Sequence, residues 1–185
     1  MLKQLQRKLA QEKKDKSIFD IILYGSAVKG KSKPNDLDIA VVFRQGALRE
    51  RLEKIQQIKR KIENGEKIDI KGILLEELFR EEFFARSGLF LEGISVFSSR
   101  PFAEKIGFSA YSLFIYSLKD KTHSQKVQFN YLLRGRDKKG ILEMMEGKFV
   151  SPGTVMISPA HSVEFGEILQ RNRVQHKKMD ILVHL

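Results

Sequence analysis

Tyr24-Gly25-Ser26-Ala27-Val28-Lys29-Gly30 and Asp36-Leu37-Asp38 stand close together near the start of this chain of 185 residues. The first motif ends an apolar run, Ile18 to Tyr24, whose β-branched residues predict a buried strand. Gly25-Ser26 breaks this strand, and Asp36 to Phe43 is the next predicted strand. A Gly-Ser turn after a strand, followed by two carboxylates one residue apart, is an arrangement for holding a nucleoside triphosphate and its metal ions.

The two carboxylates are predicted to share one face of their strand. Side chains alternate along a strand, so Asp36 and Asp38 project together while Leu37 points to the core. They lie about 7 Å apart along the strand and repel each other unless a cation lies between them. Mg²⁺ prefers oxygen ligands and can bind carboxylate and triphosphate oxygens together. Each aspartate taken alone is more typical of a turn or an edge strand, but the pair favours a metal site.

A two-metal site needs a third carboxylate on a neighbouring strand. Asp69 fits, because it shares one face of the strand predicted over Lys67 to Ile73 with Lys67 and Lys71. We therefore predict Asp36, Asp38 and Asp69 as the metal-binding carboxylates.

The turn is the candidate phosphate site. Gly25 lets a phosphate approach the backbone closely, and Ser26 supplies a hydroxyl. The amides that open a short helix, predicted from Gly25 to Gly30, add partial positive charge. Lys29, with the lysines of the following loop, is a candidate for the β- and γ-phosphates. The alternative is an ordinary strand-to-helix turn with solvated lysines.

Together the two motifs resemble the nucleotidyltransferase domain of the DNA polymerase β superfamily, and most of all the minimal nucleotidyltransferases of prokaryotes. The matching runs are Leu23-Tyr24-Gly25-Ser26-Ala27-Val28-Lys29-Gly30 and Asn35-Asp36-Leu37-Asp38-Ile39-Ala40-Val41-Val42. The resemblance covers about residues 1–100. Lys29 departs from it, because these proteins commonly have arginine there, and lysine lacks the bidentate fork.

The resemblance implies an enzyme, a transferase, with defined roles. It implies that Gly25, Ser26 and Lys29 bind the nucleotide, with ATP the expected triphosphate. It implies that Asp36 and Asp38 hold two Mg²⁺ ions and that Asp69 helps to deprotonate the acceptor. An NMP would pass from an NTP to the hydroxyl of an RNA end, a protein or a small molecule, releasing pyrophosphate. The alternative is a module without turnover that binds nucleotide or RNA, or an antitoxin-like partner protein of the same fold.

The rest of the first half alternates helices and strands. Helices are predicted over residues 2–15, 48–62 and 74–86, the last with a stop at Ser87-Gly88, and a short strand over 93–97. The predicted fold class is α/β (α+β), a small mixed sheet with flanking helices. Ser98 to Pro101 is the best candidate boundary, which divides the chain into a nucleotidyltransferase domain, 1–100, and a smaller α/β region, 101–185.

The second half carries no motif that assigns a function. Residues 111–118 suit a strand or a helix, and residues 126–133 favour a helix capped by Ser124. Strands are predicted around Pro152-Gly153, then a helix over 162–171 capped by Ser162, and a last strand over 181–183. Five basic residues mark a candidate contact for nucleic acid or the acceptor: Lys126, Arg134, Arg136, Lys138 and Lys139. The alternative is a solvated face of a packing element.

The amino-acid composition limits the classes of partner and the kinds of site that this chain can have. The net charge of +11 favours anionic partners such as nucleotides or RNA, although a basic surface without a polymer partner also fits. The chain has no cysteine, which excludes disulfides and thiolate zinc sites. No run approaches the roughly 18 apolar residues of a membrane span, and the basic N-terminus has no apolar run after it. We therefore expect a cytoplasmic protein with no membrane contact.

Overall fold

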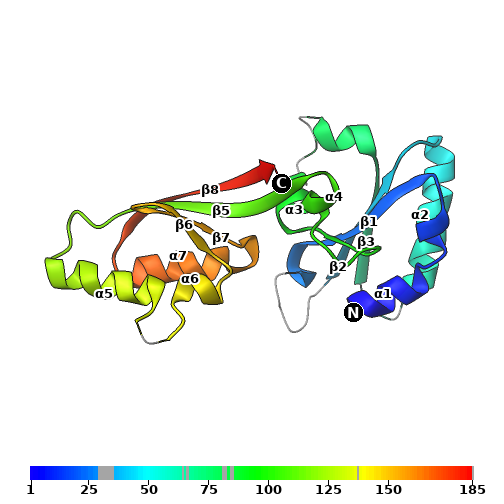
Figure 1. Cartoon of the computed structure of the whole chain (residues 1–185). Coiled ribbons are helices and arrows are strands. Elements are labelled where there is room, and N and C mark those ends of the chain that lie inside the picture. The colour runs from blue at the N-terminus through cyan, green and yellow to red at the C-terminus, as the bar shows by residue number, and fades with distance from the viewer. Residues whose placement is uncertain are drawn as a thin grey trace. The chain divides into compact units, whose positions relative to one another are not determined.

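The structure, a computed structural model, describes residues 1–28, 36–63, 65, 67–80, 83, 86–136 and 138–184 (Figure 1). The chain divides into two compact units, Met1–Phe108 and Ser109–His184. Helix α4 (Phe102–Lys105) follows the predicted boundary but belongs to unit 1, where Phe102 is completely buried. Of the helices described, none is long and apolar enough to cross a membrane.

Unit 1 is built on a four-stranded mixed sheet in the order β3-β2-β1-β4. The strands are β1 (Ile18–Tyr24), β2 (Asp36–Phe43), β3 (Lys67–Leu74) and β4 (Ile94–Ser95). β1 runs antiparallel to β2 and β4, and β2 runs parallel to β3. The predicted small mixed sheet with flanking helices is confirmed.

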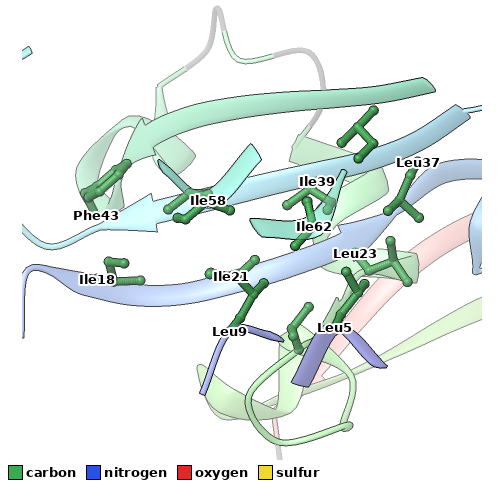
Figure 2. Close-up of a cluster of buried hydrophobic side chains, with 13 residues drawn as sticks. Leu5, Leu9, Ile18, Ile21, Leu23, Leu37, Ile39, Phe43, Ile58 and Ile62 are labelled. Carbon is green, nitrogen blue, oxygen red and sulfur yellow. The ribbon is translucent and has the colours of Figure 1, made fainter. Parts of the chain in front are cut away.

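Helices α1 (Leu2–Lys8) and α2 (Leu48–Ile62) cover one face of this sheet. Their apolar residues, such as Leu5 and Ile58, meet alternate residues of β1 and β2, such as Ile21 and Ile39, in one buried cluster (Figure 2). All four of these side chains are at most 5% exposed. The apolar residues that recur every second position in the strands therefore face those that recur every three to four positions in α2.

The opposite face is covered by η3 (Leu75–Phe79), α3 (Arg86–Glu92) and α4. Its cluster contains Ile22, Ala40, Val42 and Phe102. Because both faces are covered, the middle of β2 is apolar on both sides. Its polar residues, Asp36 and Asp38, occur only where the strand begins and its side chains become partly exposed.

Two predicted helices of unit 1 differ from the structure. The predicted helix over 74–86 is wrong: Leu74 still pairs in β3, and the 3-10 helix η3 follows it, with the Glu77 carboxylate accepting from the Leu74 amide at 2.6 Å. The predicted stop Ser87-Gly88 lies inside α3. The helix over 2–15 is α1 followed by a separate 3-10 turn, η1 (Glu12–Lys14).

Unit 2 has the order β-α-β-β-α-β of a split β-α-β fold, with a short extra helix. Its strands are β5 (Phe108–Ser117), β6 (Lys148–Ser151), β7 (Thr154–Ile157) and β8 (Gln175–His184), in the sheet order β6-β7-β5-β8. Helices α5 (His123–Arg134), α6 (Ile141–Met144) and α7 (Ser162–Arg171) lie on one side of this sheet (Figure 1).

The helices of unit 2 begin at other caps than predicted. Thr122, not Ser124, caps α5: its Oγ1 accepts from the Gln125 amide at 3.3 Å, and the Gln125 side chain accepts from the Thr122 amide at 3.0 Å. Ser162 is not the cap of α7, because the 3-10 turn η4 (Pro159–His161) leads into it, and the Ser162 hydroxyl instead accepts from Lys178 Nζ at 3.1 Å.

Candidate nucleotide and metal site

Strand register brings the predicted carboxylates to one edge of the unit 1 sheet. In β2, Asp38 lies opposite Tyr24 of β1 on one side and opposite Asp69 of β3 on the other. Asp36 lies opposite Lys67. By alternation, Tyr24, Asp38 and Asp69 share the sheet face that is covered further along by Ile22, Ala40 and Ile73. The structure therefore places all three aspartates on the same face, where β2 and β3 begin.

The Gly-Ser turn is packed against the middle carboxylate. Gly25 opens the 3-10 turn η2 (Gly25–Ala27) with a φ of +73°, a conformation that favours glycine. A Cβ atom at Gly25 would overlap the Asp38 carboxylate, with Oδ2 the nearest atom. Ser26 follows in the same turn and is half-buried. Lys29 and the rest of the predicted basic loop lie outside the described residues.

Negative charge accumulates at this edge. Burial raises the pKa of Asp38 above its usual 3.8, and the carboxylates of Asp36 and Asp69 raise it further, while Lys71 opposes the shift. Burial also raises the pKa of Tyr24 to about 12, with Asp38 and Asp69 adding to it. Both shifts have the same direction, because the negative charge at this edge opposes the ionisation of Asp38 and Tyr24.

Two lysines of β3 supply the compensation. Lys67 Nζ lies 3.6 Å from Asp36 Oδ2, and Lys71 Nζ lies 3.8 Å from Asp69 Oδ2. The Lys67 side chain is 80% exposed and that of Lys71 54%, so both pairs are open to solvent and weak. Either ammonium group is therefore free to leave its carboxylate.

The donor set suits a divalent cation in its chemistry. All its oxygens belong to carboxylates, the ligands that Mg²⁺ prefers, and their mutual repulsion is what a hard cation neutralises. Within the ranges that the structure describes, no group of three or more acidic or histidine side chains is close enough together to coordinate one metal ion. Asp36 and Asp69 remain about half exposed and paired to lysines, so binding would require them to turn toward Asp38.

Sequence reasoning overlooked three residues of this site. Tyr24 was part of the motif, and its place beside Asp38 follows from the strand phase of β1. Lys67 and Lys71 were used only to define the strand face on which Asp69 lies. Residues two apart on a strand are neighbours on that face, so their contact with the aspartates could have been predicted.

The predicted basic residues of unit 2 make several different contacts. The Arg134 guanidinium lies 4.1 Å from the centre of the Phe149 ring, and Arg136 lies 5.5 Å from that of Tyr131. Lys139 Nζ is paired with Glu143 at 2.7 Å. Arg134 lines a hollow of about 400 Å³ with Tyr116, Asn130 and Phe149. The other four predicted residues are not among its lining residues.

Comparison with known protein families identifies a family for the first half of the chain. The sequence model of the family described as "Polymerase beta, Nucleotidyltransferase" matches residues 3–100, just over half of the chain. Searches of curated proteins and of solved structures return no match. The matched segment contains all four strands of the unit 1 sheet and the turn, and with them the three aspartates.

Proposed function

Because the chain belongs to the polymerase β nucleotidyltransferase family, as its two motifs predicted, we propose that it transfers an NMP from an NTP to an acceptor hydroxyl and releases pyrophosphate. Membership supports nucleotidyl transfer in general. The observation that carries the proposal for this chain is the packing of Gly25 against Asp38, with Asp69 beside Asp38 in register. The turn and the carboxylates are thus adjacent, as a triphosphate with its cations requires.

In the proposed reaction, the acceptor oxygen attacks the α-phosphorus of the triphosphate. The bond between that phosphorus and the oxygen bridging to the β-phosphate breaks, and pyrophosphate leaves. The proton of the acceptor hydroxyl passes to Asp69. Gly25 and Ser26 hold the triphosphate, and the charge of Lys29 stabilises its terminal phosphates.

Asp36 and Asp38 would hold two divalent cations, and Asp69 would hold one of them. When bound, such ions stabilise the attacking and leaving oxygens as Lewis acids. Mg²⁺ and ATP are the proposed ion and donor, and the cytoplasm, where both are abundant, is the proposed setting. For the acceptor we keep an RNA end, a protein or a small molecule, and for the contact with it the basic residues of unit 2. The alternative of a module without turnover gains no support from the family match.

The test is transfer of label from each α-labelled NTP, with Mg²⁺ and cell extract as the source of acceptor. Asp36→Asn and Asp38→Asn should each reduce transfer by at least about 100-fold, because each removes a charge that the transition state needs. Asp120→Asn, in an exposed turn of unit 2, is the matched control and should be unaffected. Unchanged transfer by both site variants would overturn the proposal.

A further inference from the structure

A second charged site lies in unit 1, at the other end of β1. A cleft of about 580 Å³ is lined by Lys13, Lys14, Lys16, Arg44 and Lys105, together with the ring of Phe19. We call it the basic cleft. It collects residues from the turn before β1, the end of β2 and helix α4, and nothing in the proposed reaction uses it.

The charge of the basic cleft is strongly one-sided. Asp15 is its acidic lining residue, and the Asp15 carboxylate is already bound by Lys54 at 2.8 Å and by the Ser17 hydroxyl at 2.7 Å. Lys14, Lys16 and Arg44 form no ion pair within the part of the chain that the structure describes. A cleft lined by charges of one sign focuses the field and concentrates anions.

Several of its cations are held in place. The Arg44 guanidinium lies 4.8 Å from the centre of the Phe19 ring, and Lys105 Nζ lies 4.6 Å from it. Lys105 also donates to the Phe19 carbonyl at 2.7 Å and to the buried carboxylate of Asp20 at 2.9 Å. The Phe19 ring thus holds two cations at the basic cleft, and the guanidinium of Arg44 offers the planar donor fork that suits phosphate.

The distance between the basic cleft and the aspartates indicates how long a ligand must be to reach both sites. Ile18 borders the basic cleft and Tyr24 lies beside Asp38, so the two sites are separated by at least the length of β1, about 20 Å at 3.3 Å per residue. A stacked nucleic-acid strand carries one phosphate per roughly 3.4 Å, so a strand that reaches both sites needs at least about six nucleotides.

We propose that the basic cleft binds the backbone phosphates of a single-stranded nucleic-acid acceptor whose end lies at the aspartates. A nucleic-acid strand is favoured over a small anion because five cations line one cleft of about 580 Å³, which is more positive charge than one small anion neutralises. The placement of the strand's end rests on the proposed transfer reaction, whereas binding of the strand to the basic cleft does not.

The test is the salt dependence of binding to a fluorescein-labelled 12-nucleotide RNA, measured by anisotropy in the full-length chain carrying Asp38→Asn so that no transfer occurs. The triple variant K14A/K16A/R44A should lower the slope of log K against log salt by about 2, at roughly 0.7 for each lost phosphate contact. It should weaken binding at least tenfold at low salt. Lys105 is left unchanged because it neutralises Asp20.

The matched control is K3A/K59A/R60A, which removes three cations outside the basic cleft. It should leave the slope nearly unchanged. The single variant Lys16→Glu, at an exposed position, provides a second measurement and should weaken binding in the same direction. An unchanged slope in K14A/K16A/R44A, or equal losses in the control, would overturn the inference, as would tighter binding of tripolyphosphate or an acidic peptide than of the RNA.

Activity separates this inference from the proposed reaction. With the aspartates intact, K14A/K16A/R44A should lower kcat/KM for a 12-nucleotide acceptor at least tenfold while transfer to a dinucleotide stays the same. If both acceptors lose equally, the basic cleft is not a site for the strand. If no protein form transfers a nucleotide but the RNA-binding slopes behave as stated, the proposed reaction fails and the basic cleft remains a nucleic-acid site.

Discussion

The candidate site depends on the contact between Gly25 and the Asp38 carboxylate. The positive φ of Gly25 and the absence of a Cβ allow the turn to close on the Asp38 carboxylate. That carboxylate in turn lies between Tyr24 and Asp69 in the sheet. The turn, the strand and the charge cluster therefore constrain one another at a single contact.

Gly25→Ala should damage activity more than stability. The new methyl group would displace the Asp38 side chain, and the left-handed backbone would cost about 1 kcal/mol in unfolding free energy. We expect transfer to fall at least about 100-fold while the protein still folds, measured by label transfer and by thermal unfolding. Gly65→Ala is the control, because Gly65 also has a positive φ but an added Cβ there meets nothing within 4 Å. Equal activity losses in both variants would contradict this role.

Asp38→Asn should stabilise the protein in the absence of divalent cations. The pKa of Asp38 is raised in the folded state, so its contribution to stability is present below its ordinary pKa of 3.8 and is lost as the pH rises through the folded value. At pH 7 the ionised carboxylate is therefore a cost that asparagine does not carry. We expect a Tm higher by about 1 to 3 °C at pH 7, with no difference near pH 3. A lower Tm at pH 7 would contradict this argument.

At the scale of elements, Asp15 ties the turn before β1 to helix α2. Its carboxylate accepts from Ser17 and binds Lys54 of α2, and the Lys54 hydrogen bond is the main cause that lowers its pKa to about 2. This contribution to stability is present above pH 3.8 and is lost as the pH falls toward 2.

Lys54→Met should accordingly destabilise the protein by about 1 kcal/mol at pH 7 and by much less near pH 2. Urea unfolding at both pH values measures the difference. Lys59→Met, on the same helix, is the control and should show no such pH dependence. A loss of equal size at both pH values would show that Lys54 acts through packing rather than charge.

The elements with strong periodicity were predictable. The strands at 18–24 and 36–43 and the helices at 48–62 and 162–171 have the predicted bounds, because each strand is a continuous apolar run and each helix has one apolar face. The predicted helix over 74–86 was not correct. Leu74 pairs with Phe43 in the sheet, and Glu77 accepts from the Leu74 amide, so no α-helix begins at Leu74. The sheet order of unit 2 depends on pairings between distant strands, which no local pattern reports.

The candidate site was predictable to the same degree. The phase of Asp69 follows from alternation alone, and the structure places it beside Asp38. The basic cleft was not found, because it joins Lys16, Arg44 and Lys105 from separate segments, and only the fold brings them together. In the sequence, Lys13, Lys14 and Lys16 stand at the end of the helix predicted over residues 2–15, where basic residues are common and indicate no site.

At the scale of the whole molecule, the folding unit extends beyond the family match. The match ends at residue 100, but α4 adds the buried ring of Phe102 and the ammonium group that neutralises Asp20, whose side chain is fully buried. Burial of a phenylalanine is worth about 2 to 3 kcal/mol, and leaving a buried charge unpaired costs about 3 to 5 kcal/mol.

A chain that ends at Arg100 should therefore be largely unfolded, whereas one that ends at Phe108 should fold. The expected loss is comparable to the total stability of a typical domain, about 5 to 15 kcal/mol. Circular dichroism and thermal unfolding of the two truncated chains distinguish them. Two chains of equal Tm would show that α4 is dispensable. The rescue is Asp20→Asn in the shorter chain, which removes the buried charge and should restore part of the structure.

The two ends of β1 differ in charge: three aspartates lie near Tyr24, two of them paired with lysines of β3, whereas lysines and arginine surround Ile18. Such a difference in charge exerts a torque on any long anion that approaches, because one end attracts it more strongly than the other. Torque of this kind changes the speed of association more than the final affinity, and it weakens as salt shortens the Debye length, about 10 Å at 0.1 M. A nucleic-acid strand would then be oriented before it binds, with its phosphate backbone near the basic cleft and its end near the aspartates.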